Sequence, residues 1–310
     1  MDWQPSASLE TIRERARIYQ KIRAFFATRD YLEVDTPILS IATNTDANIA
    51  SIGASNLGQS LYLQTSPEFA MKRLLAADSG SIYQICHAFR EGEQGIRHRP
   101  EFTLLEWYRP GFDYQQLMDE VEALIDCLSG QKNNFQRVRY CDLLVHQTGV
   151  DVTSIALPQL RVRCASLLPG TDTQALDFNQ CLDLLIALVA APAMQGYLFV
   201  YDYPLSQAAL ARASKSNPGV AERFELFHDG LELANGFSEL TDAKIQRERF
   251  EADNRQREAN TLPRYPIDNF LLAALEYGLP ECAGIALGLD RLLMVLLNLD
   301  SIDEVMTFSD

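Results

Sequence analysis

The sequence predicts an α+β fold, an antiparallel sheet flanked by helices, formed by residues 1–310 as one domain. Three observations predict this fold class. The chain opens with apolar residues at helical spacing, two strand-like segments flank a short charged loop, and the dipeptide Asp229-Gly230 joins two further strand-like segments. No internal repeat, low-complexity tract or linker divides the chain, so one domain is the simplest organisation.

The first predicted element is a long amphipathic helix over residues 8–30. Its apolar residues recur every three or four positions, and Ser8 is placed to cap its N-terminus. The segment 31–37 then predicts a short strand that stops at Pro37, since proline cannot donate a hydrogen bond to a ladder.

A strand and a second helix follow. Residues 61–64 have strand composition, and residues 66–77 predict a helix with Ser66 at the cap and Pro67 at the first helical position. Glu68 lies in the first turn of this helix. Its plain interpretation is a carboxylate that complements the helix dipole.

Two strands, 81–90 and 101–110, enclose the charged loop. In the second strand Phe102, Glu106 and Tyr108 share one face, because side chains alternate, and Phe102 and Glu106 stand about 13 Å apart. This spacing suits a long ligand with a flat ring on Phe102 and a cationic end at Glu106. The alternative is that the face is core, but a core face does not readily take an unpaired glutamate.

The loop itself is rich in arginine. The stretch FREGEQGIRHRPEF, residues 89–102, holds three arginines, a histidine and three glutamates in an otherwise acidic chain. A guanidinium group binds carboxylate or phosphate through two parallel hydrogen bonds. The partner of these arginines is therefore either a local glutamate or an anionic ligand.

The Asp229-Gly230 turn sets the register of a hairpin. If residues 229–230 form the turn, Phe227 faces Glu232 and Glu225 faces Ala234, which makes the two glutamates diagonal neighbours on one face. Adjacent carboxylates repel each other unless a cation joins them, and oxygen ligands of this kind suit Mg²⁺. Side chains that merely point into solvent are an equal alternative from the hairpin alone.

The remaining segments are mostly scaffold. Residues 112–197 predict amphipathic or buried helices without a chemical signature, residues 241–260 a polar surface helix, and residues 267–278 a buried helix. Residues 281–299 predict a glycine-spaced strand that turns into an apolar helix. Arg291 lies at that junction, where a helix N-terminus and a guanidinium group together favour an anion.

The composition excludes several classes of protein. Of the 310 residues 47% are hydrophobic, and the formal net charge is -15. Such a surface repels polyanions, and the sequence shows no concentrated basic patch for extended nucleic-acid binding. The six cysteines lack metal-ligand spacing, and the chain has neither a signal peptide nor an apolar run that could span a bilayer. The sequence therefore predicts a cytoplasmic protein with no membrane segment.

Taken in order, these motifs resemble those of a known family. The proline-terminated opening helix and strand, the F-R segment with its downstream R-H-x-P-E-F loop, and the glycine-spaced strand closing on D-R are similar to motifs 1, 2 and 3 of the class II aminoacyl-tRNA synthetases. The segments SPEF, PEFTLLEWY and ELANGFSEL resemble the lysyl-tRNA synthetase catalytic domain. The ordered set spans almost the whole chain, and it implies the class II synthetase catalytic fold.

The resemblance implies an ATP site and a lysine pocket. For ATP it implies Arg90 at the α-phosphate and Arg291 at the γ-phosphate as catalytic residues, His98 and Phe102 at the adenine, Glu93 as the motif 2 carboxylate, and Glu225 with Glu232 as Mg²⁺ ligands. For the amino acid it implies Ser66 and Glu68 near the backbone amine, Glu106, Tyr108 and Glu239 around the ε-ammonium, and Asn235, Phe237 and Ala286 along the pocket.

Three departures from lysyl-tRNA synthetase narrow the function. The chain reaches the motif 1 helix by residue 8, so no N-terminal anticodon-binding domain is expected. The family has glycine where this motif 3 strand has Ala286, which places a methyl group beside the amino-acid pocket. The motif 2 glutamate position is Gly92, so Glu91 or Glu93 supplies that carboxylate, and we favour Glu93.

The first two departures resemble a freestanding paralogue of lysyl-tRNA synthetase. Those enzymes attach (R)-β-lysine to a lysine ε-amino group on translation elongation factor P, a protein whose shape imitates tRNA. The resemblance implies an ATP-dependent and Mg²⁺-dependent ligase that forms an acyl-adenylate, assembles as a homodimer through the opening helix and strand, and has no tRNA partner.

Alternative functions come from other classes of protein. One is a tRNA-independent or truncated lysyl-tRNA synthetase-like enzyme that activates α-lysine. An amidoligase on the same scaffold would need a pocket for an acidic side chain, which Glu106 and Glu239 would repel. A catalytically inactive regulatory paralogue would be expected to lose the ATP-binding arginines, and both Arg90 and Arg291 are present.

Overall fold

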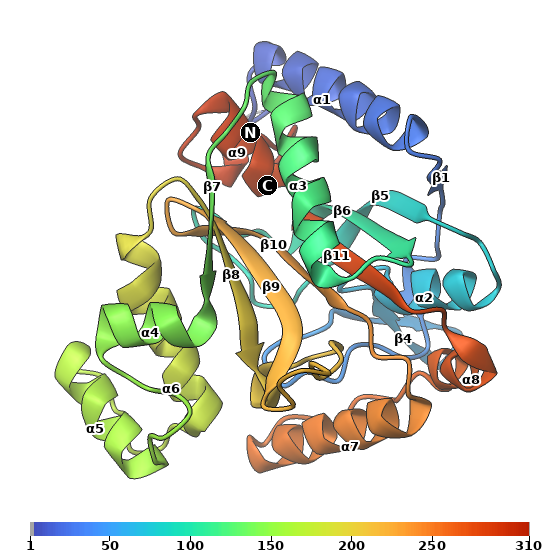
Figure 1. Ribbon diagram of the computed structural model, residues 1–310. Coiled ribbons are helices and arrows are strands. Elements are labelled where there is room, and N and C mark those ends of the chain that lie inside the picture. The colour runs from blue at the N-terminus through green and yellow to red at the C-terminus, as the bar shows by residue number, and fades with distance from the viewer. Residues whose placement is uncertain (1–2, 310) are drawn as a thin grey trace. The chain divides into compact units, whose positions relative to one another are not determined.

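The computed structural model describes residues 3–309, so Met1, Asp2 and Asp310 at the ends of the predicted domain lie outside the described residues. The chain divides into two compact units. Unit 1 consists of Met1–Gln131 and Glu239–Asp310, and unit 2 of Lys132–Ser238. Each unit combines a sheet with helices, as the α+β prediction requires (Figure 1).

Unit 1 contains most of the predicted elements. They are α1 (Leu9–Ala27), β1 (Leu32–Glu33), β2 (Leu39–Ser40), β3 (Gly53–Asn56), β4 (Gln59–Leu63), α2 (Glu68–Ala76), β5 (Ile82–Phe89), β6 (Glu101–Pro110), α3 (Tyr114–Ser129), α7 (Ala243–Ala259), α8 (Asn269–Gly278), β11 (Cys282–Gly288) and α9 (Leu289–Leu297).

The main sheet of unit 1 is antiparallel except at its edge. Strand β5 pairs with β6 and β6 with β11 in antiparallel register, whereas β1 runs parallel to β5. A separate antiparallel sheet, β2-β4-β3, was not predicted beyond its middle strand. Helix α1 packs against α3, and α2 packs against α8 (Figure 1).

The first helix has the predicted cap, and two other boundaries differ from prediction. The N–H of Thr11 donates to Oγ of Ser8 at 3.0 Å, so Ser8 caps α1. Strand β1 ends at Glu33, four residues before Pro37. Helix α2 begins at Glu68, so Pro67 rather than Ser66 is its capping residue.

Ser66 still contributes to the start of α2. Its Oγ accepts the N–H of Glu68 at 3.0 Å. The predicted capping position was therefore wrong by one residue. The hydroxyl of Ser66 accepts the unpaired N–H of Glu68, and Pro67 lies between the two residues at the capping position.

The far face of β6 belongs to the core of unit 1. The buried Trp107 donates its indole N–H to Glu120 on α3 at 3.1 Å, and Arg109 donates to the same carboxylate at 2.7 Å. Tyr31 completes the set with its hydroxyl, 2.6 Å from Glu120. Alternation along β6 thus turns Trp107 and Arg109 to the α3 side and leaves the opposite face for Glu106 and Tyr108.

Unit 2 is built on four strands, β7 to β10, with its own helical core. Its elements are β7 (Phe135–Arg139), α4 (Tyr140–Thr148), α5 (Leu157–Leu167), α6 (Phe178–Leu185), β8 (Tyr197–Pro204), β9 (Val220–His228) and β10 (Leu231–Ser238). Strand β7 runs parallel to β8, and β8, β9 and β10 pair antiparallel. Apolar side chains of α4, α5 and α6 pack together with β8 into one buried cluster.

The predicted hairpin is present with one change of register. Asp229 and Gly230 both have positive φ, 47° and 77°, as a two-residue turn between twisted strands requires. Glu232 faces Phe227 as predicted, but Glu225 faces Asn235 instead of Ala234. A β-bulge between Glu232 and Ala234 inserts one residue, which composition alone does not reveal.

Within residues 3–309, the longest helices are too polar and the apolar helices too short for any of them to span a bilayer.

Candidate functional site

The predicted site residues divide between the two units. Unit 1 contains Ser66, Glu68, Arg90, Glu93, His98, Phe102, Glu106, Tyr108, Glu239, Ala286 and Arg291, and unit 2 contains Glu225, Glu232, Asn235 and Phe237. Each group is described within its own unit.

Glu106 is a buried carboxylate in which only one of the two oxygens has a hydrogen-bond partner among the described residues. It lies on β6 and is only 1% exposed. Its Oε1 accepts the hydroxyl of Tyr108 at 2.6 Å and lies 3.5 Å from Oγ of Ser66. Its Oε2 is buried and has no hydrogen-bond partner among the described residues. A buried acceptor without a donor is costly, so this oxygen points to a ligand that donates to it.

A second pair of carboxylates surrounds Lys72. Nζ of Lys72 lies 2.6 Å from Oε1 of Glu68, one turn earlier on α2, and 2.5 Å from Oε2 of Glu239. Lys72 and Glu239 are both buried, and Oε1 of Glu239 has no hydrogen-bond partner within residues 3–309. Ser66 and Glu68 also line a pocket of about 130 Å³.

Lys72 was not predicted as a site residue. Four residues separate it from Glu68, so the two side chains share one face of α2. That spacing inside a segment of apolar residues was the available signal, but the sequence does not show that Glu239 approaches the same face.

Burial controls the protonation of these carboxylates. Desolvation raises the pKa of Glu106 to about 8, and the charge of Glu68 adds to the shift. Desolvation also raises the pKa of Glu239 to about 8, against the opposing effect of Lys72. Burial alone would lower the pKa of Lys72, but Glu239 and Glu68 together raise it, so this ammonium keeps its charge.

Strand β11 places two small residues beside Glu106 and Tyr108. Ala286 is the direct cross-strand partner of Glu106, and Gly284 is that of Tyr108. A Cβ on Gly284 would lie 2.2 Å from the Tyr108 ring and 2.5 Å from Oε1 of Glu239. Glycine is therefore required at 284, a role that its spacing in the sequence did not disclose.

Arg90, the arginine of the F-R segment, contacts a carboxylate through one nitrogen and has another nitrogen without a partner among the described residues. Nη1 of Arg90 lies 3.3 Å from Oε1 of Glu93, and its guanidinium carbon lies 4.9 Å from the centroid of Phe102. Nε of Arg90 is buried without a hydrogen-bond partner among the described residues. Glu93, which the sequence favoured as the motif 2 carboxylate, thus contacts the arginine, and its role at the nucleotide stays a prediction.

Arg291 and His98 contact each other at the start of α9. Nη2 of Arg291 lies 2.6 Å from Nε2 of His98, and Nε of Arg291 donates to the carbonyl of Arg97 at 3.3 Å. A guanidinium group can only donate, so Nε2 of His98 accepts and the neutral ring carries its proton on Nδ1. The fold therefore brings together two residues that are 193 positions apart in sequence.

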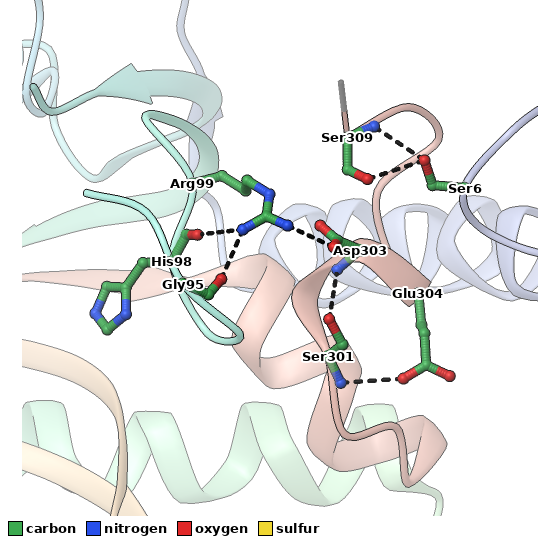
Figure 2. A network of polar contacts seen from close by, with 8 residues as sticks. All are labelled: Ser6, Gly95, His98, Arg99, Ser301, Asp303, Glu304 and Ser309. Atoms are coloured by element: carbon green, nitrogen blue, oxygen red, sulfur yellow. Dashed lines mark hydrogen bonds and ion pairs between the residues drawn. The ribbon is translucent and has the colours of Figure 1, made fainter. Parts of the chain in front are cut away.

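Arg99 fixes the loop that carries His98. It donates to the carbonyls of Gly95, at 2.6 Å, and His98, at 2.9 Å, and forms an ion pair with Asp303 (Figure 2). The N–H of Ile302 also donates to the carbonyl of Ile96 at 2.9 Å. The C-terminal segment thereby holds the loop, an arrangement between distant segments that sequence reasoning missed.

In unit 2, Arg223 ties the hairpin residues together. It donates to Glu225 at 2.6 Å and to Oδ1 of Asn235 at 3.2 Å, while the hydroxyl of Tyr203 donates to Glu225 at 2.6 Å. Glu232 is exposed on the neighbouring strand. Burial raises the pKa of Glu225 to about 7; Arg223 opposes this shift and Glu232 adds to it.

Phe237 lies on the same strand as Asn235 and is buried, directly across from Arg223. Sequence reasoning also missed Arg223, because nothing in the segment ERFELF distinguishes its arginine from a solvent-exposed one.

Comparison with known proteins agrees with this geometry. The model of the family "tRNA synthetases class II (D, K and N)" matches residues 1–310. A protein of Proteus mirabilis named "Elongation factor P--(R)-beta-lysine ligase" is 47% identical, over 99% of this chain and 97% of its own length. Proteins of the same name from Edwardsiella ictaluri and Salmonella paratyphi B are 46% and 44% identical over the same shares.

These matches confirm the predicted class II synthetase fold and the resemblance to the freestanding paralogues. Because the similarity covers nearly the full length of both chains, the chain belongs to the class II tRNA synthetases of the D, K and N type and, among them, to the family of elongation factor P–(R)-β-lysine ligases.

Proposed function

We propose that this chain is an ATP-dependent ligase that activates (R)-β-lysine as an acyl-adenylate and transfers it to a lysine ε-amino group on elongation factor P. The observation that carries this function is the pair of buried carboxylates, Glu106 and Glu239, each with an oxygen that no described residue satisfies. A ligand with an ammonium group supplies the missing donors, whereas an acidic ligand would be repelled.

The first half-reaction joins the amino acid to AMP. The carboxylate of the amino acid attacks the α-phosphorus of ATP, an acyl-phosphate bond forms and pyrophosphate leaves. Arg90 would donate to the α-phosphate through its open Nε, with Phe102 beside it as the surface for the adenine ring. Arg291 would bind the γ-phosphate. His98, which contacts Arg291 here, would contact the adenine when the nucleotide is bound.

Glu225 and Glu232 are the proposed Mg²⁺ ligands. Both are carboxylates, the ligand type that Mg²⁺ prefers. Arg223 and Tyr203 orient Glu225, and Glu232 is exposed on the neighbouring strand. When bound, the ion would neutralise phosphate charge.

The second half-reaction forms an amide. The neutral ε-amino group on elongation factor P attacks the acyl carbon of the adenylate, AMP leaves with the phosphate oxygen and the nitrogen releases a proton. The protein partner is taken from the names of the relatives. We place this reaction in the cytoplasm, where that factor acts.

Mass spectrometry of the acceptor tests the proposed function. Purified elongation factor P is incubated with the enzyme, ATP, Mg²⁺ and either (R)-β-lysine or α-lysine. We expect one added lysyl group, with faster addition of the β-isomer. Charging of tRNA with α-lysine and no modification of the factor would instead favour a lysyl-tRNA synthetase-like enzyme.

We also propose a homodimer through α1 and β1. Leu9 on α1 and Leu32 on β1 are 63% and 55% exposed, which leaves apolar surface on the segment that corresponds to motif 1. Sedimentation should show a dimer, and a monomer at every concentration would contradict this assembly.

A further inference from the structure

The amino-acid pocket contains one more ionisable group than the proposed reaction uses. Glu68, Glu106 and Glu239 supply three carboxylates, and the buried ammonium of Lys72 lies among them. With all four groups charged, the cluster carries two negative charges. A buried cluster with uncompensated charge is unfavourable, so two cations must enter it from outside.

In each of the two most buried carboxylates, one oxygen contacts a side chain and the other has no hydrogen-bond partner among the described residues. Oε1 of Glu106 is held by Tyr108 and Oε2 is open, while Oε2 of Glu239 is held by Lys72 and Oε1 is open. Glu68 uses Oε1 for Lys72 and lies at the pocket. Lys72 therefore engages two of the three carboxylates and orients both.

We propose that Lys72 is a positioning residue that fixes the charge of the pocket at two negative charges, so that the site takes a ligand with two ammonium groups and releases protons as that ligand binds. This inference rests on the proposed function. The charge of the pocket gives a reason why the site would choose a diamino acid. Without the amino acid the pocket holds two protons, and with it two ammonium groups take their place.

The ionisation of the carboxylates supports this exchange. Burial raises the pKa of both Glu106 and Glu239 to about 8, so near neutral pH each holds a proton for much of the time. The ε-ammonium group of a lysine isomer remains charged up to a pH of about 10, and the backbone ammonium group is charged near neutral pH and below. Binding below pH 8 must therefore displace protons, and the number displaced falls as the pH rises through the pKa values of the carboxyls.

Other titratable groups lie on the elements around the cluster. They are Asp35 after β1, Arg73 on α2, Cys86 on β5, Tyr108 on β6, Asp268 at the cap of α8 and Glu276 on α8. Burial and the charge of Glu106 raise the pKa of Cys86 and of Tyr108 further above neutrality. Asp268 caps α8 by accepting the N–H groups of Phe270 and Leu271, and Glu276 is exposed.

Calorimetry in two buffers of different ionisation enthalpy measures the protons released. The ligands are (R)-β-lysine, α-lysine and a 3-amino acid that lacks the terminal amine, each bound to the full chain. At about pH 6.5 we expect wild type to release up to two protons with either lysine isomer and about one with the monoamine. Release should fall as the pH rises through about 8.

The variants isolate the role of Lys72. Lys72→Met leaves Glu68 and Glu239 without their internal cation, so the two ammonium groups of a lysine isomer no longer balance the three carboxylates. We expect an affinity for lysine isomers roughly thirtyfold weaker at neutral pH. The loss should grow as the pH rises, because a proton must stay in the filled pocket in place of the missing cation. Lys72→Arg keeps the charge and should restore most of the wild-type affinity. Lys244→Met, on the exposed side of α7, is the matched control and should behave as wild type.

The experiment distinguishes failure of the proposed role of Lys72 from failure of the proposed function. Lysine affinity in Lys72→Met equal to or tighter than wild type overturns the inference. If Lys72→Met does not fold, wild-type binding with no proton release between about pH 6 and about pH 9 overturns it instead. Failure of wild type to bind any lysine isomer would overturn the proposed function, not only the role of Lys72.

Discussion

At the scale of single residues, the site is defined by carboxylates in unfavourable surroundings. Glu106 and Glu239 are 1% exposed and hold oxygens that no described residue satisfies. Such groups reduce the stability of the folded chain unless a ligand compensates them. Their persistence in a well-packed sheet is the local reason to assign them to binding instead of folding.

Replacement of Glu106 should affect the amino acid and not the nucleotide. Glu106→Gln keeps the shape but removes the charge opposite an ammonium group, so we expect the Kd for lysine isomers to rise by roughly thirtyfold or more while the KM for ATP stays the same. Glu101→Gln, at the exposed start of the same strand, is the control. Equal losses for both ligands would show that Glu106 is structural.

Ala286 should select between the isomers of lysine. Its methyl group lies across from Glu106 on β11, where it would crowd an α-amine more than a β-amine, which sits one carbon further from the carboxylate. We expect Ala286→Gly to improve use of α-lysine relative to (R)-β-lysine by about ten- to two-hundredfold, the range for one carbon in a pocket. The kcat/KM values of both isomers measure this, and an unchanged ratio would assign Ala286 to strand packing.

At the scale of elements, the start of α9 is tied to α1 and β6. Asp290 accepts from Arg15 on α1 at 2.6 Å and from the N–H of Thr103 on β6 at 2.6 Å, and Arg15 donates to the hydroxyl of Thr103 at 2.8 Å. The side chains next to these residues, Phe102 and Arg291, are proposed nucleotide contacts. The buried ion pair between Arg15 and Asp290 therefore fixes the two elements that carry Phe102 and Arg291.

The loop after β5 should depend on its tie to the C-terminal segment. Arg99→Ala removes the contacts with Gly95, His98 and Asp303, so we expect a looser loop and a several-fold higher KM for ATP, with little change in the Kd for lysine (Figure 2). Arg97→Ala removes a guanidinium group from the same loop without cutting this tie, and a smaller effect is expected. If both variants lose the same affinity, loop charge rather than loop position is responsible.

At the scale of the whole molecule, pH should control stability through the empty pocket. The pKa of Glu106 rises from 4.5 to about 8 on folding, so the folded chain holds this proton more tightly than the unfolded chain. Its contribution to stability is complete below the unfolded value and is lost as the pH rises through about 8.

The difference in Tm between wild type and Glu106→Gln measures this contribution. We expect wild type to lose stability relative to the variant between about pH 4.5 and about pH 8, and added (R)-β-lysine to restore more stability at the upper end. A difference in Tm that does not change with pH would contradict the raised pKa.

Periodicity and turn chemistry determined the elements of this protein. Spacing of apolar residues predicted α1, and the Asp229-Gly230 turn predicted the hairpin of β9 and β10. Alternation along β6 placed Glu106 and Tyr108 on one face. These signals are local, because they depend on backbone geometry over a few residues, and so a sequence contains them.

Contacts between distant segments were decided only by the tertiary structure. The approach of Glu239 to Lys72, of Arg99 to Asp303 and of Asp290 to Arg15 joins residues far apart in the chain, and no local pattern specifies which carboxylate an ammonium or guanidinium group will meet. The bulge in β10 likewise depends on how β9 and β10 pair along their whole length. The sequence by itself thus determined the local elements and predicted the candidate site residues. Long-range packing decided the partners, the burial and the protonation of those residues, because burial and pairing are properties of the assembled fold.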